Sequence, residues 1–193
     1  MKVVIIEYNA GNICSVDIAL QKIGINAILS DNAMEIRSAD KVIFPGVGAA
    51  ATAMQYLIER NLDRVIKELN QPLLGICLGM QLLCAFSEEG QTGCMGVFPQ
   101  TVKQFKGAMK IPQMGWNNVS DLKTSIFNGV SENEYMYFVH SYYVAINENT
   151  IASTDYGGKY SAALQKDNFY AVQFHPEKSA KAGQKILENF IAL

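Results

Sequence analysis

Cys77 stands in a sequence context suited to a reactive thiol. In the segment 73–80 an apolar, strand-like run changes directly into a helical pattern, and glycines lie two residues before and two residues after the cysteine. Such a tight strand-to-helix reversal strains the central residue, and small neighbours keep its side chain exposed. The positive end of a helix dipole at this position favours the thiolate. We therefore predict a nucleophile at Cys77. A buried core thiol is the alternative, and it is our interpretation of Cys14, Cys84 and Cys94.

His175 and Glu177 supply the base that a nucleophilic thiol needs. They flank Pro176, directly after an apolar run that ends at Phe174. Proline fixes its own φ and turns the chain, so both side chains can aim at one point. In triad chemistry a carboxylate holds the imidazole tautomer and stabilises the imidazolium. Because both motifs follow strands of one α/β sheet, we expect them to meet at its carboxyl edge. A lone strand-end histidine beside a solvated carboxylate is the alternative.

The segment Phe44–Gly48 predicts an oxyanion hole. It leaves a strand and opens a helix, and its two glycines permit φ values that turn successive backbone N–H groups toward one anion. We expect an N–H from Val47 or Gly48 to act together with that of Leu78, the residue after the nucleophile. A plain turn between strand and helix is the alternative. A phosphate loop is disfavoured because no Gly-Lys-Ser/Thr follows.

The first 80 residues alternate short β-rich runs with helical patterns, which is typical of βαβ units around a parallel sheet. We expect strands at 2–7, 26–29, 41–44 and 73–76. An apolar helical face from Ile13 to Ile23 is expected to end at Gly24. A second helical region, 57–69, is expected to break near Asn61.

Beyond residue 97 the sequence favours strands and turns. Alternating segments predict strands at 97–105, 135–139, 143–146, 161–165 and 170–174, with a turn at 156–159. We expect a turn-rich segment at 110–117 and an amphipathic helix at 180–193. With no repeat or linker, residues 1–193 predict one flavodoxin-like α/β domain with a mostly parallel central sheet, helices on both of its faces and an antiparallel extension.

Composition favours small-molecule chemistry. The 193 residues are 49% hydrophobic and 18% charged, and the formal net charge is −2. This balance excludes a disordered chain and gives no electrostatic footprint for nucleic acid or an anionic membrane. The apolar run within residues 1–8 is too short for the hydrophobic region of a signal peptide, so we expect a cytoplasmic protein. The four cysteines and two histidines lack zinc-ligand spacing, so we expect no metal.

Three ordered motifs carry a family resemblance. Pro45–Gly48, Gly75–Gln81 and His175–Glu177 together resemble the class I (triad) glutamine amidotransferases. The segments 7–12, 87–90, 110–117 and 137–142 are similar to the glutaminase subunits of imidazole glycerol phosphate synthases, and the similarity covers the whole chain. Departures occur at Glu7 and Asn9, where Asp and Gly are frequent, and at Gln113, where His is common.

The resemblance implies a mechanism without a cofactor. Cys77 would attack glutamine and form a glutamyl thioester, His175 would act as general acid and base, and Glu177 would orient it. A carboxylate can hold the substrate ammonium, and backbone donors and hydroxyls can receive its carboxylate. The family's glutamine pocket corresponds to Gly46, Gly48, Gln81, Glu89, His140, Ser141 and Tyr142.

The resemblance also implies a partner. A separate (β/α)₈ cyclase subunit would form a heterodimer with this chain through Asn12, Trp116, Asn117 and Tyr137. The cyclase would receive ammonia through an internal channel and make imidazole glycerol phosphate and aminoimidazole carboxamide ribotide in histidine biosynthesis. A role for Trp116 in capping the core is the alternative for that residue.

Two other functions stay open. The same glutaminase chemistry could serve a paralogous synthase for amidino-sugar assembly. A non-enzymatic flavodoxin-like module could use Cys77 as a redox sensor, since exposed thiolates oxidise readily. The redox module gives no reason for His175 and Glu177.

Overall fold

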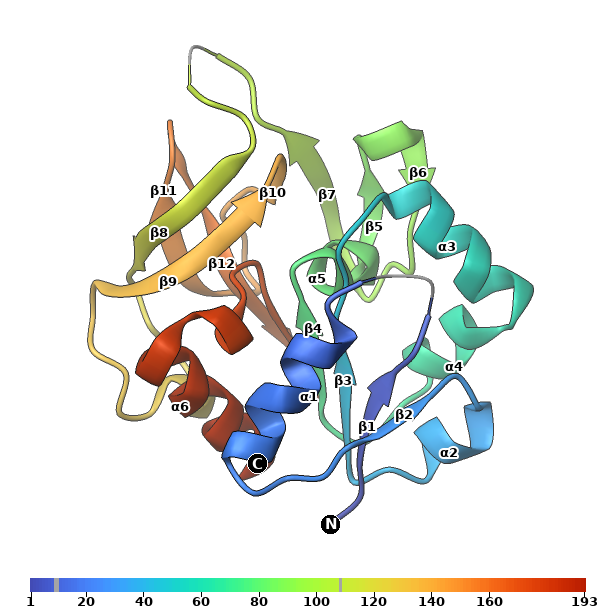
Figure 1. Ribbon diagram of the computed structural model, residues 1–193. Coiled ribbons are helices and arrows are strands. Elements are labelled where there is room, and N and C mark those ends of the chain that lie inside the picture. Colours follow the sequence, from blue (N-terminus) through green and yellow to red (C-terminus); the bar gives the residue numbers. More distant parts are fainter. Residues whose placement is uncertain (9–10, 108) are drawn as a thin grey trace.

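A seven-stranded sheet forms the centre of the computed structural model, which describes residues 1–8, 11–107 and 109–193 (Figure 1). Five neighbouring strands, β2-β1-β3-β4-β13, run parallel, and β12 and β11 continue the sheet antiparallel. The strands of this sheet are β1 (Val3–Ile6), β2 (Ile28–Ser30), β3 (Lys41–Phe44), β4 (Leu73–Ile76), β11 (Thr150–Asp155), β12 (Lys159–Lys166) and β13 (Phe169–Val172).

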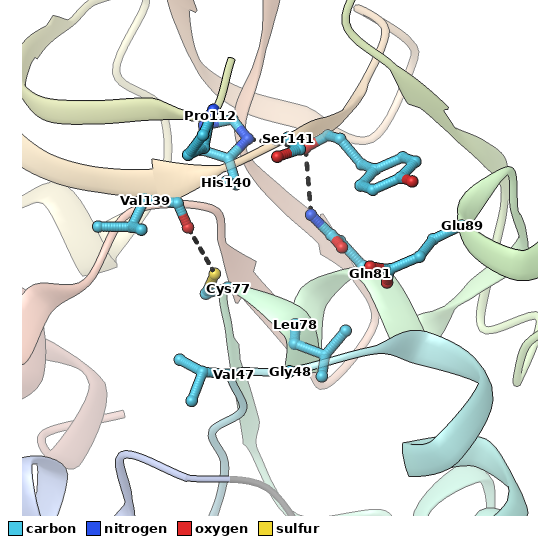
Figure 2. A pocket seen from close by; sticks show the side chains of 11 residues that line it. Val47, Gly48, Cys77, Leu78, Gln81, Glu89, Pro112, Val139, His140 and Ser141 are labelled. Carbon is cyan, nitrogen blue, oxygen red and sulfur yellow. Dashed lines mark hydrogen bonds between the residues drawn. The ribbon is translucent and has the colours of Figure 1, made fainter.

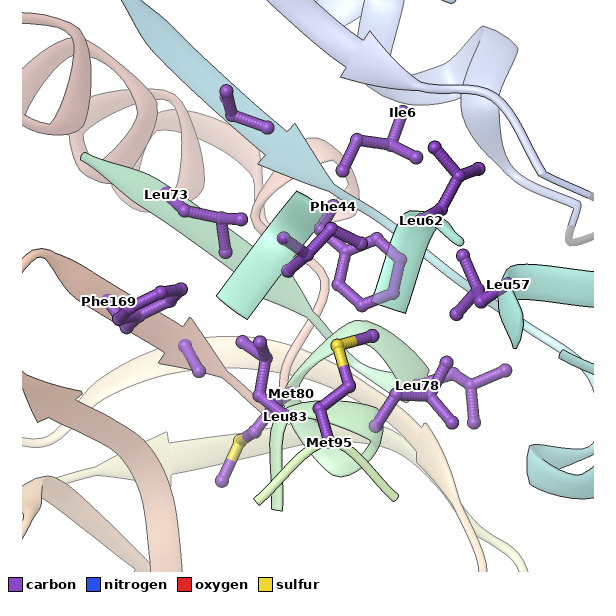
Figure 3. Packing of buried hydrophobic residues seen from close by; sticks show 14 of the residues in the cluster. Ile6, Phe44, Leu57, Leu62, Leu73, Leu78, Met80, Leu83, Met95 and Phe169 are labelled. Atoms are coloured by element: carbon purple, nitrogen blue, oxygen red, sulfur yellow. The ribbon is translucent and has the colours of Figure 1, made fainter. Parts of the chain in front are cut away.

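Helices cover both faces of this sheet, because alternate residues of each strand point to opposite sides. Along β1, Val4 and Ile6 pack into one apolar cluster and Val3 and Ile5 into the other. Figure 3 shows the first cluster, in which Phe44 lies among side chains of the helices. The helices are α1 (Ile13–Lys22) and α6 (Ala180–Ile191) on one face, and α2 (Ala33–Arg37), α3 (Ala50–Glu59), α4 (Leu62–Lys67) and α5 (Leu78–Leu83) on the other.

Two smaller sheets extend the domain above the carboxyl ends of the parallel strands (Figure 1). One has the order β10-β7-β5-β6, and β8 pairs antiparallel with β9 in the other. Their strands are β5 (Cys84–Ser87), β6 (Thr92–Gly93), β7 (Phe98–Gln104), β8 (Gln113–Val119), β9 (Glu134–His140) and β10 (Tyr142–Val144), and three 3-10 turns are η1 (Glu89–Gln91), η2 (Ser125–Phe127) and η3 (Pro176–Lys178).

The expected α/β architecture is confirmed, with two local differences. The segment 110–117 was expected to be turn-rich, but β8 begins within it at Gln113 and pairs with β9 over seven residues. The extension is not purely antiparallel, since β5 and β7 pair in parallel. Asn61 does separate two helices, with a left-handed φ of 56°. Asn9, one of the departures from the family pattern, lies outside the described residues, as do Ala10 and Ala108.

Within the described ranges, no helix is both long enough and apolar enough to cross a membrane.

Candidate active site

Cys77 occupies a strained position between β4 and α5. Its φ of 53° and ψ of −105° lie in a region that non-glycine residues rarely adopt. The two flanking glycines allow this reversal by close packing. A Cβ on Gly79 would lie 1.9 Å from the carbonyl oxygen of Phe44, and one on Gly75 would lie 3.1 Å from the backbone of Gly79. The glycine spacing is therefore what lets strand, turn and helix pack against β3.

The expectation of an exposed Cys77 is wrong. Only 5% of the residue is accessible, and its sulfur lies 3.7 Å from the carbonyl oxygen of Val139 on β9. The small neighbours bring secondary structures together and do not open the thiol to solvent. The extension formed by β8 and β9 closes over it, and the surrounding groups therefore control its chemistry.

His175 and Glu177 form a buried pair beside Cys77. The strand β13, which precedes them, is the parallel neighbour of β4, so both motifs meet at one sheet edge. His175 Nδ1 lies 2.8 Å from Glu177 Oε1, and the two side chains are 1% and 0% exposed. Cys77 lies close enough to the imidazole to raise its pKa. Because Nδ1 is taken by Glu177, Nε2 is the ring atom left for the thiol.

The protonated form of His175 is favoured in this pair. Burial lowers the pKa of the imidazole, but the hydrogen bonds to Cys77 and Glu177 raise it further than burial lowers it, to about 10. The charges of the same two groups add to this rise. A histidine held as imidazolium beside a cysteine is the acid that an acyl-transfer reaction needs to protonate its leaving group.

Asn12, which is half-buried, contacts this buried pair. It precedes α1 with a left-handed φ of 76°, a conformation that asparagine tolerates. Its Nδ2 donates to Glu177 Oε1 and lies 3.5 Å from His175 Nδ1. A charge-assisted hydrogen bond of this kind fixes a carboxylate more firmly than a neutral one. Asn12, expected only at a partner contact, therefore lies against the acid of the triad.

A cavity of about 240 Å³ opens in front of Cys77. Figure 2 shows the sulfur pointing toward Val139, across from Val47 and Gly48. The expected pocket residues that line it are Gln81, Glu89, His140, Ser141 and Tyr142, together with Val47, Gly48 and Leu78 from the expected oxyanion hole, and Pro112 and Val139 line it as well.

Gly46 is not part of this lining. Its carbonyl oxygen accepts a hydrogen bond from the N–H of Leu78, at 3.2 Å. The Leu78 donor expected for the oxyanion hole is therefore occupied by a backbone carbonyl in this conformation. The Tyr8 side chain packs beneath: a Cβ on Gly46 would lie 2.1 Å from its hydroxyl. That hydroxyl is buried and has no hydrogen-bond partner among the described residues.

Glu89 joins the cavity to the chain after the oxyanion loop. Its Oε2 accepts from the N–H of Ala50, at 2.8 Å, at the start of α3. A carboxylate at a helix N-terminus is stabilised by the helix dipole. One carboxylate oxygen of Glu89, the residue expected to bind the substrate ammonium, is thus already hydrogen-bonded to the backbone of Ala50, two residues after Gly48.

His140 is both a lining residue and a satisfied core histidine. Its Nδ1 lies 2.7 Å from the carbonyl oxygen of Tyr142, and its Nε2 lies 3.1 Å from the hydroxyl of Tyr160. Burial lowers its pKa to about 4, so the ring is neutral at physiological pH. Gln113, expected on a partner-facing loop, is instead 3% exposed and contacts the same Tyr160 hydroxyl at 2.6 Å.

The comparisons with known proteins agree with this geometry. Residues 4–193 match the model of the family described as glutamine amidotransferase class-I. The chain belongs to this family. It is 57% identical, over the full length of both chains, to imidazole glycerol phosphate synthase subunit HisH of Bacteroides fragilis (strain YCH46), and 44% identical to HisH of Blochmanniella floridana, also over both full lengths. The expected resemblance to glutaminase subunits of these synthases is confirmed.

Two solved structures share the fold. A crystal structure of a glutamine amidotransferase has a TM-score of 0.72 at 19% identity, covering 98% of this chain and 97% of that one. The structure of PurLQS from Thermotoga maritima has a TM-score of 0.70 at 15% identity, covering 99% of this chain and 97% of that one.

The exposed face of the β8–β9 hairpin carries large apolar side chains in this amidotransferase. Trp116 is 52% exposed, and its ring meets that of Tyr137, its cross-strand neighbour, edge to face at 5.8 Å. Met114 and Tyr135 add to the same face, at 64% and 58% exposed. Asn117 points elsewhere, since its Nδ2 donates to the carbonyl of Asp155 at 2.8 Å.

Sequence reasoning missed Gln173, Val139 and Tyr8. Gln173 is fully buried, and its Nε2 lies 3.7 Å from Cys77 Sγ. Its position two residues before His175 was visible in the sequence, but nothing in a single glutamine indicates contact with a distant thiol. Val139 acts through its backbone carbonyl, which no side-chain pattern can indicate. In the described part of the amidotransferase, no group of three or more His, Cys, Asp or Glu side chains could hold a metal ion.

Proposed function

We propose that this amidotransferase hydrolyses glutamine to glutamate and ammonia, and that the ammonia serves a partner cyclase in histidine biosynthesis. The observation that carries the first part is the buried Cys77–His175–Glu177 group at the floor of an amino-acid-sized cavity. The relatives, named as HisH subunits of imidazole glycerol phosphate synthase, support the second part.

In the first step the Cys77 sulfur attacks the amide carbon of glutamine. The carbonyl π electrons move to oxygen, giving a tetrahedral oxyanion. His175 then gives its Nε2 proton to the amide nitrogen and the C–N bond breaks. Ammonia departs, and a glutamyl thioester remains on Cys77. Glu177 holds the imidazolium throughout, supported by Asn12. In the second step His175 takes a proton from water, and the resulting hydroxide displaces the thiolate to give glutamate.

The cavity residues fit the two ends of an amino acid. Glu89 brings a carboxylate for the substrate ammonium, and the Ser141 hydroxyl and nearby backbone donors suit its carboxylate. Gln81 and Tyr142 lie between these ends. His140 is neutral and bonded on both ring nitrogens, so we assign it the task of holding the Tyr142 backbone.

The oxyanion hole would form by rotation of the Gly46–Val47 peptide. Rotation withdraws the Gly46 carbonyl from Leu78 and turns the Val47 N–H toward the same place, so two donors face the oxyanion. Gly48, with φ of 118°, gives the loop a conformation that only glycine adopts easily. Loss of one such donor costs about 10² to 10³ in rate, so the unrotated chain would be a slow glutaminase.

The cyclase, a (β/α)₈ protein, would bind on the face formed by Met114, Trp116, Tyr135 and Tyr137. Large exposed aromatic side chains with a neighbouring apolar residue are typical of interface centres. The strand behind this face touches the triad directly. The Tyr137 carbonyl accepts from the His175 N–H at 2.8 Å, and the Val139 carbonyl contacts Cys77. A displacement of β9 by the bound partner would therefore reach the nucleophile.

An interface closed to water would keep the ammonia unprotonated on its way to the partner. We include Asn12, a half-buried neighbour of the triad, at the edge of this interface.

We further propose that the protein acts in the cytoplasm together with its partner. The paralogous amidino-sugar synthase remains the competing partner assignment, and the HisH relatives do not favour it. The redox module is disfavoured because it gives no role to the buried His175–Glu177 pair beside Cys77.

An isotope experiment tests the proposal. Glutamine labelled with ¹⁵N in its amide is supplied to this chain, with and without the cyclase of the same genome and its ribonucleotide substrate. We expect slow glutamate release by the chain alone, strong stimulation in the mixture, and ¹⁵N in the imidazole product. Glutamate release without ¹⁵N transfer would contradict the partner assignment. An inactive mixture would contradict the glutaminase itself.

A matched pair of variants tests the docking face. Trp116→Ala removes a large side chain that is 52% exposed, and Ile58→Ala removes one that is 54% exposed on α3, on another part of the surface. We expect only Trp116→Ala to weaken cyclase binding, by tenfold or more at a central interface position. Equal affinities of the two variants would place the contact elsewhere.

A further inference from the structure

Gln173 is a buried amide whose contacts connect the nucleophile with the cavity. It follows β13, and no part of it is exposed. Its Oε1 accepts a hydrogen bond from Gln81 Nε2 at 3.0 Å, and its Nε2 lies 3.7 Å from Cys77 Sγ. Gln81 Nε2 also donates to the carbonyl oxygen of Tyr142 at 3.1 Å. A chain of two amides thus runs from the cavity wall to the reactive sulfur.

The Tyr142 carbonyl, at one end of these hydrogen bonds, fixes which atom of each amide donates and which accepts. A backbone carbonyl can only accept, so the Gln81 atom that faces Tyr142 has to be the NH₂ group. The second N–H of that group then faces Gln173, whose nearest atom has to be its oxygen. The Gln173 NH₂ group is left to face Cys77. The orientation of both amides therefore follows from the Tyr142 carbonyl.

The sulfur of Cys77 therefore lies between an acceptor and a donor. The Val139 carbonyl can receive the S–H of the neutral thiol, but it repels a thiolate. The Gln173 N–H does the opposite, because it strengthens when the sulfur carries a full charge. The other ionisable groups near the sulfur are the His175 imidazolium with Glu177 behind it, and the phenols of Tyr8 and Tyr160. Burial raises the pKa of both phenols, so they stay neutral.

We propose that Gln173 is a hydrogen-bond donor to the Cys77 thiolate and that Gln81 orients it for this task. The inference rests on the proposed nucleophile role of Cys77, and it adds a residue in contact with the reacting sulfur. Gln81 is then a positioning residue as well as a lining residue. Both of its N–H groups are used, so its Oε1 is what it offers to a substrate N–H in the cavity.

The test is the alkylation of Cys77 by iodoacetamide as a function of pH, followed by mass spectrometry of the peptide that contains Cys77. No glutamine is present, so the readout reports the thiolate and not substrate binding or turnover. Gln173→Met keeps the length of the side chain and removes its N–H donors. We expect alkylation at pH 7 to fall about tenfold, which is the lower end for loss of a hydrogen bond to a charged group. At high pH the rate should return to that of the unmodified chain.

Gln165→Met is the matched control. Gln165 lies on β12 opposite Tyr170, near the start of β13, whereas Gln173 follows the other end of that strand. The same change of side chain there should leave the alkylation profile unchanged. In the glutaminase assay with the cyclase, Gln173→Met should lower kcat and leave KM within about twofold, since the lost bond is made to the nucleophile.

A second variant covers the case in which Gln173→Met does not fold. Gln81→Glu keeps the side-chain shape but offers only oxygen atoms, so Gln173 has to reverse and turn its own oxygen toward the sulfur. We expect slower alkylation at pH 7 here too, together with a raised KM. An unchanged alkylation profile in either folded variant overturns the proposal. If the chain proves not to hydrolyse glutamine at all, the alkylation result still decides the role of Gln173.

Discussion

The two sides of Cys77 are in different states. On one side, Glu177 and His175 are buried, joined at 2.8 Å and supported by Asn12. On the other side, the Gly46 carbonyl occupies the Leu78 N–H that an oxyanion would need. The parts that activate the sulfur are assembled, while the parts that would stabilise the product of its attack are closed.

The difference separates two costs of catalysis. Contacts within the chain bring the Cys77 sulfur and the His175 imidazole together, so this arrangement needs no partner. The oxyanion hole needs rotation of one peptide, and the same loop leads into α3, which Glu89 holds through Ala50. A ligand or partner that favours the rotated state by a few kcal/mol would change the rate by orders of magnitude without touching the triad.

The largest effect is expected from the sulfur itself. Cys77→Ser replaces the thiolate by a hydroxyl that this histidine cannot ionise to a comparable extent. We expect glutamine hydrolysis by the complex to fall by about 10⁴-fold or more. Cys14→Ser is the control and should keep full activity, because Cys14 is exposed and does not lie in the core as the sequence led us to expect. Residual activity above one per cent in Cys77→Ser would show that Cys77 is not the nucleophile that His175 and Glu177 activate.

The closed side is tested at Val47. Val47→Pro removes the N–H that peptide rotation would bring to the oxyanion, and Val47→Ala keeps it. We expect kcat of the complex to fall about 10²- to 10³-fold in the proline variant only. Alkylation of Cys77 by iodoacetamide should stay unchanged in both. Equal activity of the two variants would show that Val47 is not a donor.

Glu177 sets the pH range of the activated side. The pKa of His175 is raised to about 10, so the imidazolium persists up to that pH and is lost above it. Glu177→Gln removes one cause of this rise, so the pKa should move down toward its ordinary value. The alkaline limb of kcat for the complex should therefore shift to lower pH, with a loss of about tenfold at pH 7. An unmoved alkaline limb would show that another group controls it.

Asn12 should give the smallest effect. Asn12→Ala removes one donor to Glu177 Oε1, and we expect kcat to fall about three- to tenfold, the range for the net contribution of one hydrogen bond. Asn12→Asp places a second carboxylate beside Glu177 and should cost more. If Asn12→Ala lowers the affinity for the cyclase more than it lowers kcat, Asn12 acts only in partner binding and does not support the triad.

Local patterns predicted the triad because each motif fixes its own turn. Gly75, Gly79 and Pro176 determine where the chain leaves its strand, and parallel neighbours bring such ends together. Both bounds of the strands 41–44 and 73–76 were predicted correctly, since a fully buried parallel strand is visible in a sequence as a short apolar run. The edge strand β2 begins two residues later and ends one residue later than expected, because its exposed side chains constrain its position weakly.

Long-range contacts could not be predicted from the sequence. The β8 strand contains Gly115 and two asparagines, which disfavour strands, and it forms because β9 offers seven paired residues. The burial of Cys77 comes from that same hairpin closing over it. The hydrogen bond from Leu78 to Gly46 depends on one peptide orientation, which residue types do not encode.

One measurement compares the two sides directly. Cys77 alkylation by iodoacetamide and glutamine hydrolysis are followed on the same sample, before and after addition of the cyclase with its ribonucleotide. Alkylation needs only the thiolate, whereas hydrolysis also needs the oxyanion donors. We predict rapid alkylation and slow hydrolysis in the chain alone, and a rise of about 10²-fold or more in hydrolysis alone when the partner is added. Slow alkylation that rises in step with hydrolysis would contradict the account, because the triad would then be the part that the partner assembles.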